Sequence, residues 1–205
     1  MQTHTDQIKQ RYNRIAPFFD GMEACFEGLF FKRWRQRLWE KAQGKHILEV
    51  GVGTGKNFDF YPSNAKITAI DFSEKMLAIA KQKAEKRYVD VSLNLMDVEY
   101  LDYGDNCFDT VIASFVFCSV PHPRRGLKEL HRVCKPGGKV ILLEHEISGN
   151  ETLANIMNKL NPLVVKTVGA NINRQTLNAV KSCGFKMVYV DCVGGDVVKV
   201  IEAVK

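Results

Sequence analysis

The stretch HILEVGVGTG, residues 46–55, decides the fold of this 205-residue chain. Residues 46–50 form a short apolar run, and closely spaced glycines follow it. Buried parallel strands have this apolar character. Glycines after such a strand permit a tight turn and let the backbone approach a ligand where a Cβ atom would collide. The stretch therefore predicts a buried strand followed by a ligand-binding loop that opens a helix.

Further apolar runs on both sides of this stretch alternate with helical patterns. Strands are expected at 46–50, 66–71, 91–96, 108–115, 139–146, 186–193 and 197–204, and helices at 5–15, 29–42, 73–87 and 123–134. Alternation of this kind predicts an α/β fold with a mostly parallel sheet and helices on both faces. Ser73 is the expected N-cap of its helix, and Ala16-Pro17 is an expected hinge. Gly-Gly-Asp at 194–196 predicts that the last two of seven strands form an antiparallel hairpin.

The amino-acid composition favours a globular protein over a secreted or membrane-spanning one. Hydrophobic residues make up 45% and charged residues 25%, as in one globular domain spanning 1–205. The polar N-terminus does not resemble a signal peptide, and no apolar run is long enough to span a bilayer. The six cysteines form no CxxC pair, so we expect a reduced, cytoplasmic protein without a metal site. The net charge is +6, and KRWRQR at 32–37 is either a solvated helix face or a patch that attracts an anionic surface.

Three carboxylates follow the first three expected strands and point to the kind of ligand. Glu49 precedes the first glycine, Asp71 closes the second strand, and Asp97 follows the third. Asp71 could accept hydrogen bonds from both hydroxyls of a ribose, and Asp97 could accept one from an adenine amino group. Glycine-rich loops also bind dinucleotides, but Glu49 would repel a pyrophosphate and could instead meet a cationic amino group. A small cationic nucleoside fits these residues better than a dinucleotide does.

The segments LEVGVGTG, AIDFSEKML, MDVEYL, FDTVIASFVFCSVP and ELHRVCKPGGKVILLEH stand in the order of the class I methyltransferase motifs. The chain resembles that family over roughly residues 8–146. The resemblance implies a Rossmann-like class I methyltransferase fold and S-adenosylmethionine as the methyl donor. For Phe72 and Met76, plain core packing is the alternative interpretation. The residues implied to bind the donor, besides Glu49, are Gly51, Gly53, Asp71, Phe72, Met76, Asp97, Val98 and Ser114.

The N-terminal RYNRIAPFFD, residues 11–20, resembles the YDxxAxxYD segment of ubiquinone-biosynthesis and phospholipid methyltransferases. That segment folds over the cofactor in those families, so residues 1–44 are expected to form a helical lid. Tyr12 would then lie near the methyl donor, as a cofactor-binding and catalytic residue, and Phe19 would face the acceptor. The alternative is that Tyr12 packs on a helix face. Asn13 stands where the family usually has Asp, and Phe19 where it often has Tyr.

The acceptor side of the site is expected to involve histidines and a C-terminal insert. His145 and His122 follow strands at the cofactor's end of the sheet, and either could act as a base or could be a strand-end or turn residue. Residues 148–176 are the expected acceptor insert, with an apolar cluster over 153–165 that suits a lipid-like substrate. Within it, GANINRQT resembles alkyl-thiol methyltransferases and, more loosely, phosphatidylethanolamine N-methyltransferases, which places Asn171 and Arg174 at the acceptor. Alternatively, Asn173 caps a helix and Arg174 is exposed at its start.

These features favour a methyltransferase acting on a small or lipid-like acceptor through an N, S or O atom, such as a phospholipid amine or an alkyl thiol. The basic N-terminal helix could contact a membrane. A nucleic-acid or protein methyltransferase is the alternative, although SFVF at 114–117 replaces the NPPY-type motif and no RNA-binding domain is expected. The terminal hairpin and Glu49 argue against a dinucleotide-dependent oxidoreductase. A non-catalytic binding protein would not need the complete motif series. Cys25, Cys118 and Cys183 are too dispersed to hold arsenite.

Overall fold

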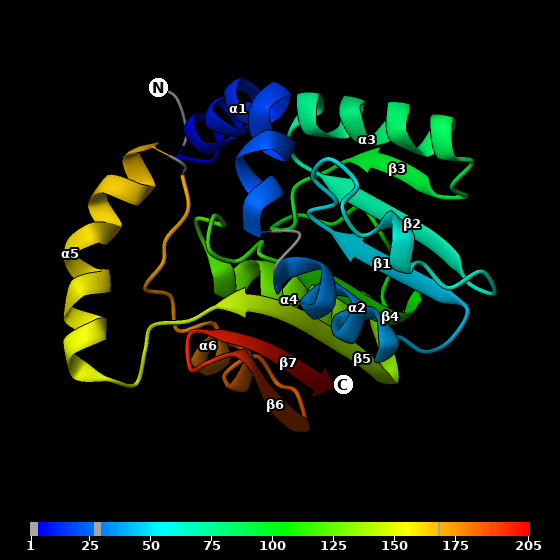
Figure 1. Cartoon of the computed structure of the whole chain (residues 1–205). Coiled ribbons are helices and arrows are strands. Elements are labelled where there is room, and N and C mark those ends of the chain that lie inside the picture. Colours follow the sequence, from blue (N-terminus) through cyan, green and yellow to red (C-terminus); the bar gives the residue numbers. More distant parts are fainter. Residues whose placement is uncertain (1–3, 27–29, 168) are drawn as a thin grey trace.

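A seven-stranded sheet lies at the centre of the computed structural model, which describes residues 4–26, 30–167 and 169–205 (Figure 1). The strand order is β3-β2-β1-β4-β5-β7-β6. The first five strands pair in parallel, and β7 pairs antiparallel with both β5 and β6. This confirms the predicted mostly parallel sheet with a closing hairpin. The strands are β1 (His46–Val50), β2 (Lys66–Asp71), β3 (Ser92–Leu95), β4 (Phe108–Ser114), β5 (Cys134–His145), β6 (Met187–Gly194) and β7 (Val198–Val204).

Helices cover both faces of the sheet, as predicted. The helices are α1 (His4–Phe26), α2 (Lys32–Glu40), α3 (Glu74–Arg87), α4 (Pro123–Val133), α5 (Glu151–Thr167) and α6 (Thr176–Lys181). Alternate residues along the central strands enter two separate cores. Val111 packs in the core with Leu127 of α4, whereas its neighbour Ile112 packs in the core with Leu38 of α2. The α3 side chains Ala80 and Ala84 close a third core over β2.

The first helix does not break at Ala16-Pro17, as the sequence had suggested. Helix α1 runs through Pro17, because a proline removes one backbone hydrogen bond but does not prevent a helix that tertiary packing stabilises. Ile8 and Ala16 are buried on its inner side. The second helix begins at Lys32, and the predicted start at 29 lies outside the described residues. Phe30, just before this helix, is exposed.

The chain after β1 also differs from the prediction. No α-helix follows the glycines; the loop enters a single 3-10 turn, Phe58–Phe60. Gly51, Gly53 and Gly55 have positive φ angles and the residues between them do not. A backbone that alternates between these two conformations cannot form an α-helix. The predicted cap of α3 is confirmed, since the Ser73 hydroxyl accepts a hydrogen bond from the backbone N–H of Met76.

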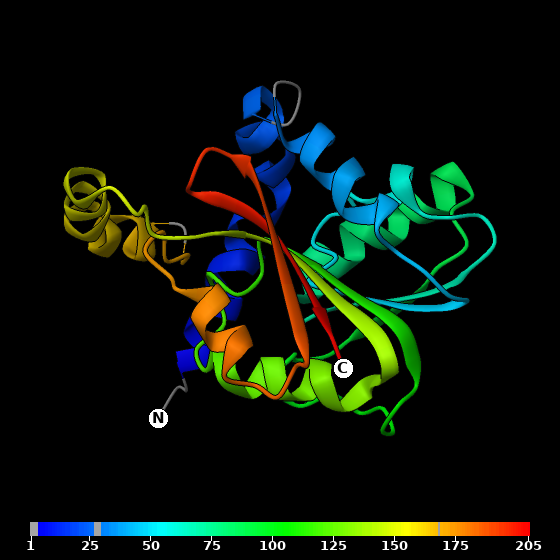
Figure 2. The ribbon, with the colours of Figure 1, turned by 90° about the horizontal axis from the view of Figure 1, so that it is seen from below.

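Helix α5 stands apart from the sheet in both views of the ribbon (Figures 1 and 2). None of its side chains is buried. The chain enters it from the end of β5 and returns from it toward α1 before forming α6 (Figure 1). Among the described helices, none is long and apolar enough to cross a membrane.

Candidate functional site

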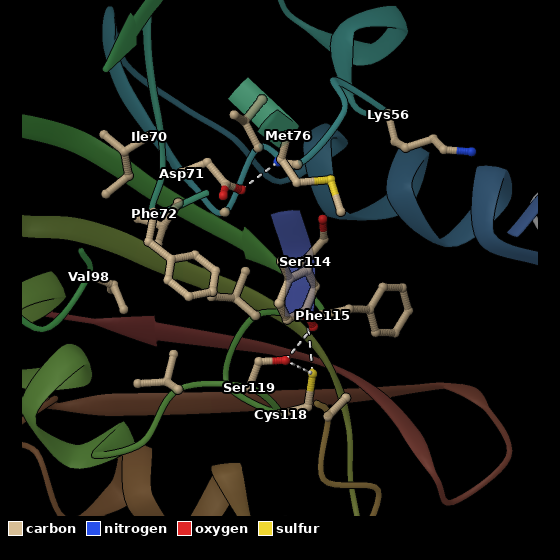
Figure 3. Close-up of a pocket in the computed structure, with 18 of the residues that line it drawn as sticks. Lys56, Ile70, Asp71, Phe72, Met76, Val98, Ser114, Phe115, Cys118 and Ser119 are labelled. Atoms are coloured by element: carbon tan, nitrogen blue, oxygen red, sulfur yellow. Dashed lines mark hydrogen bonds between the residues drawn. The ribbon is translucent and has the colours of Figure 1, made fainter. Parts of the chain in front are cut away.

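A cavity of about 280 Å³ opens at the carboxyl ends of the parallel strands, beneath helix α1 (Figure 3). Strands β1, β2, β4 and β5 and the loops that follow them form its floor. Most of its lining is apolar, as in typical small-molecule sites. Eleven of the predicted site residues line it: Tyr12, Phe19, Gly51, Gly53, Asp71, Phe72, Met76, Asp97, Val98, Ser114 and His145. Glu49, His122, Asn171 and Arg174 do not line it.

The glycine loop forms one wall of the cavity. Gly51 has a φ of +68°, and a Cβ atom there would lie 2.4 Å from a methyl group of Val116. Gly53 has a φ of +55°, and no atom lies within 4 Å of its Cβ position. The first glycine is therefore required by packing as well as by conformation, while the second keeps the loop open toward a ligand.

Asp71, at the end of β2, is the carboxylate best placed to bind a ribose. Its Oδ2 accepts a hydrogen bond of 2.8 Å from the N–H of Gly53 (Figure 3). Its Oδ1 accepts one of 2.8 Å from the N–H of Ser73. Burial raises the pKa of Asp71 to about 6, although these bonds oppose the shift. Each carboxylate oxygen can accept a further bond. The side chain therefore fixes the glycine loop and still offers acceptors to the cavity.

Phe72, Met76, Asp97 and Val98 surround the part of the cavity expected to hold an adenine. Met76 is fully buried under the Ser73 cap of α3, and the rings of Phe72 and Tyr12 meet edge to face at 5.6 Å. Burial raises the pKa of Asp97. An aromatic ring and a thioether beside one carboxylate suit a flat heterocycle with an amino group.

Glu49 does not occupy its expected position beside a ligand's amino group. The side chain is fully buried below the cavity, where Asn57 donates to Oε1 and the Tyr61 hydroxyl donates to Oε2. Burial raises the pKa of Glu49 to about 7. Glu49 therefore organises the residues under the glycine loop and does not line the cavity.

Arg35 lines the cavity and was missed in the sequence. Its side chain belongs to KRWRQR, which was interpreted as an exposed basic segment, yet Arg35 is only 5% exposed. Its Nη1 donates to Ser114 Oγ at 3.0 Å, and its guanidinium lies over the ring of Phe115. The helical phase of α2, which turns Arg35 and Leu38 inward together, is the signal that could have identified it.

The acceptor end of the cavity is aromatic. Phe115 follows β4 with a φ of +56°, a strained conformation for a bulky residue, and its ring lies 4.7 Å from that of His145. Burial lowers the pKa of His145, which keeps the imidazole neutral at neutral pH. The hydroxyl groups of Tyr12 and Ser119 share a hydrogen bond of 2.5 Å. The sequence did not identify Phe115 or Ser119, because FVFCSV after β4 looks like continued core.

Asn171 and Arg174 do not line the cavity and support its wall from behind. The backbone N–H and Nδ2 of Asn171 both donate to the carbonyl oxygen of Cys118, at 2.8 and 3.0 Å. Arg174 Nη2 donates to the carbonyl oxygen of Val120 at 2.9 Å. The capping alternative is also wrong, because α6 begins at Thr176 and Arg174 is partly buried.

His122 lies in the turn before α4 and does not line the cavity. Its ring is largely exposed, and its backbone N–H and Nδ1 both contact the buried carboxylate of Glu99. These contacts hold the start of α4. The turn interpretation of His122 is therefore the one that the structure favours.

Helix α1 is tied over the cavity by polar contacts. Asn13 Oδ1 accepts hydrogen bonds from the Ser73 hydroxyl at 2.7 Å and from the N–H of Lys75 at 3.2 Å. Asp20 Oδ1 accepts one from Thr54 Oγ1 at 2.7 Å, and the same carboxylate pairs with Lys83. Asn13 thus works as an acceptor at the position where the resembling families have Asp.

Comparisons with known proteins agree with this geometry. The family described as "Methyltransferase domain" matches residues 48–142. A phosphatidylethanolamine N-methyltransferase of Cereibacter sphaeroides is 40% identical over 142 residues, which cover 68% of each chain. The ubiquinone/menaquinone biosynthesis C-methyltransferase UbiE of Geotalea daltonii is 32% identical over 148 residues, covering 68% of this chain and 63% of that protein. A solved structure from Thermotoga maritima, described as a possible histamine N-methyltransferase, superposes with a TM-score of 0.73 at 22% identity, over 93% of this chain and 98% of that one.

Proposed function

The chain belongs to the family of S-adenosylmethionine-dependent methyltransferases, and from that premise we propose that it methylates a small, lipid-like acceptor, with a phospholipid amine as the first candidate. The observation that carries this proposal is the acceptor end of the cavity, where a neutral imidazole lies among aromatic rings. The name of the Cereibacter relative supports an amine, and that of the Geotalea relative supports a quinone as a second lipid-like acceptor.

The cofactor-binding residues are proposed from the lining of the cavity. Asp71 would accept hydrogen bonds from the ribose, and Asp97 would accept one from the adenine amino group, between Phe72 and Met76. Arg35, beside Ser114, would hold the carboxylate of the amino-acid part. Gly51, Gly53 and Val98 would contribute backbone and apolar contacts. The cofactor supplies a methyl group on a positively charged sulfur.

The chain's own residues position the acceptor and manage its proton. An amine that is protonated in water must lose a proton before it can attack, and a ring nitrogen of His145 is available because burial keeps the imidazole neutral. Tyr12 and Phe19, both from α1, close the cavity from above and exclude water. A thiol acceptor would depend less on His145, since it loses its proton more readily.

We also propose roles for two segments and a location. Residues 1–44 would act as the lid and residues 148–176 would shape the approach of the acceptor. The enzyme would work in the cytoplasm at a membrane surface, because the described cysteines are all free thiols and the proposed acceptor resides in a bilayer. The predicted contact through KRWRQR is weakened by the inward position of Arg35.

A methyl-transfer assay with labelled S-adenosylmethionine tests the proposal. Candidate acceptors are phosphatidylethanolamine in vesicles, a long-chain thiol, a quinone in micelles and polar soluble amines. We expect labelled product from a lipid-like acceptor. His145→Ala should lower kcat for an amine by about 10²-fold or more while leaving the affinity for S-adenosylmethionine unchanged. Turnover of polar, water-soluble acceptors alone would refute the proposal.

A further inference from the structure

Helix α5 leaves a set of apolar side chains exposed to solvent, whereas a surface helix ordinarily turns its apolar side chains toward the protein. Asn161 receives a hydrogen bond of 2.8 Å from the N–H of Ile172 and donates one of 3.2 Å to Asn171. Asn158 accepts another of 2.8 Å from Asn173. The asparagine side of α5 therefore attaches it to the chain that follows.

The opposite side of α5 carries an exposed apolar stripe. Leu153, Ile156, Leu160 and Leu163 are 40%, 48%, 49% and 61% exposed. With 3.6 residues per turn, these four side chains fall within an arc of roughly 80°. Exposed apolar side chains scattered singly are ordinary, but an aligned row on a projecting helix marks an interaction surface. The stripe is too regular to be explained by packing within this chain.

Cations lie beside this stripe. Lys159 and Lys166 lie along one edge of it on α5, and both are exposed. A groove of about 310 Å³ between α1 and the end of α5 is lined by Arg11, Arg14, Lys166 and neighbouring polar residues. No acidic side chain is among the described residues that line this groove.

Arg11 is fixed within the groove and the other cations are not. Its Nη1 donates to the carbonyl oxygen of Val165 at 2.7 Å, which joins α1 to the last turn of α5. No ion pair or hydrogen bond of the Arg14 or Lys166 side chain occurs within the described ranges. A guanidinium held in place beside two unpaired cations suits a phosphate group.

We propose that the α5 stripe and this groove form the face by which the protein docks on an anionic phospholipid surface. The stripe would enter the interface between headgroups and acyl chains, while Arg14, Lys166 and Lys159 would meet lipid phosphates. The choice of a membrane as partner rests on the proposed function. The combination of an apolar row with flanking cations is what an interfacial helix requires, and it favours a lipid surface over a neutral protein partner.

Vesicle flotation without cofactor or acceptor tests this inference separately from catalysis. Vesicles of phosphatidylcholine alone are compared with vesicles in which about one third of the lipid is phosphatidylglycerol. Leu160→Asn tests the stripe, and Met187→Asn on β6 is its control because both side chains are 49% exposed. The double variant R14E/K166E tests the cations, and K81E/K86E on α3 carries the same change of charge on exposed residues.

We expect the wild-type protein to bind the anionic vesicles, and we expect L160N and R14E/K166E each to weaken binding by about tenfold or more. The two control variants should bind like the wild type. All four variants should keep the wild-type circular dichroism spectrum, and the two control variants should also keep the affinity for S-adenosylmethionine. Failure to bind anionic vesicles, or equal binding by all variants, would overturn the inference while leaving the proposed function standing. So would a wild-type dimer that L160N converts to a monomer, since a second copy would then cover the stripe.

Discussion

Replacement of Asp71 tests the donor site in the most quantitative way. The carboxylate accepts backbone hydrogen bonds from Gly53 and Ser73, and its remaining acceptor capacity faces the cavity. Hydrogen bonds to a charged group contribute about 1.5–3 kcal/mol each. Asp71→Ala removes both proposed bonds to the ribose, so the affinity for S-adenosylmethionine should fall by roughly 10²- to 10⁴-fold.

The Asp71→Asn variant distinguishes the role of this side chain in binding S-adenosylmethionine from its role in the stability of the fold. The amide oxygen can still accept, so we expect a smaller loss of affinity, about 10- to 100-fold. However, the amide NH2 must then face the N–H of Gly53 or Ser73, which are both donors. An unsatisfied buried donor costs about 1–3 kcal/mol, and Tm should fall by roughly 2–12 °C.

Isothermal calorimetry measures the affinities, and thermal unfolding measures Tm. Asp102→Asn is the control, because that carboxylate is exposed and lies outside the cavity. An Asp71→Ala variant that folds and binds S-adenosylmethionine as tightly as the wild type would refute the assignment. An Asp71→Asn variant with unchanged Tm would refute the role of the carboxylate in holding the loop.

Three further predictions concern the frame of the site. Gly51→Ala should destabilise the protein by about 1–3 kcal/mol more than Gly137→Ala. Both glycines have positive φ angles, but only Gly51 lacks space for a Cβ atom. Equal unfolding midpoints of the two variants in urea would contradict this. Burial raises the pKa of Glu144 to about 7, so its contribution to stability is greatest at low pH and is lost as pH rises from about 4.5 through 7. Glu144→Gln should therefore gain stability relative to the wild type between pH 5 and 8, and a constant difference in the free energy of unfolding would disprove the shift. Asn171→Ala removes the side-chain hydrogen bond to the carbonyl oxygen of Cys118. It should lower kcat several-fold without changing the affinity for S-adenosylmethionine. A change in the affinity for S-adenosylmethionine alone would contradict a role of Asn171 in supporting the acceptor end of the cavity.

The sheet was predictable because local signals and topology agree. The run 46–50 is apolar and is followed by glycines, and the hairpin has its turn residues at 194–196. Parallel strands then place their carboxyl ends at one edge, which brings Gly51, Asp71 and Asp97 to one cavity without any knowledge of side-chain packing. The helix through Pro17 was not predictable in this way, because contacts with the rest of the protein outweigh a local breaking signal.

The errors at the site come from side chains whose environment is set by distant residues. From the sequence alone, Glu49 is expected to be free to bind a ligand. In the structure, both of its carboxylate oxygens accept hydrogen bonds from within the chain, one from Asn57 and one from Tyr61. Arg35 looks exposed in a basic run, but α2 packs against the sheet and turns it inward. The position of Glu49 does not follow from spacing along the chain, since it depends on how the loop after β1 folds back on the strand. The position of Arg35 follows from helical spacing only once Leu38 is known to be buried.

Calorimetric titration of the wild-type protein with S-adenosylmethionine, followed by methyl transfer to phosphatidylethanolamine vesicles in the same preparation, tests the central claim most directly. We predict one saturable cofactor site per chain and labelled methyl groups in the lipid fraction. Absence of cofactor binding by a folded protein would contradict the claim, whatever acceptor is offered.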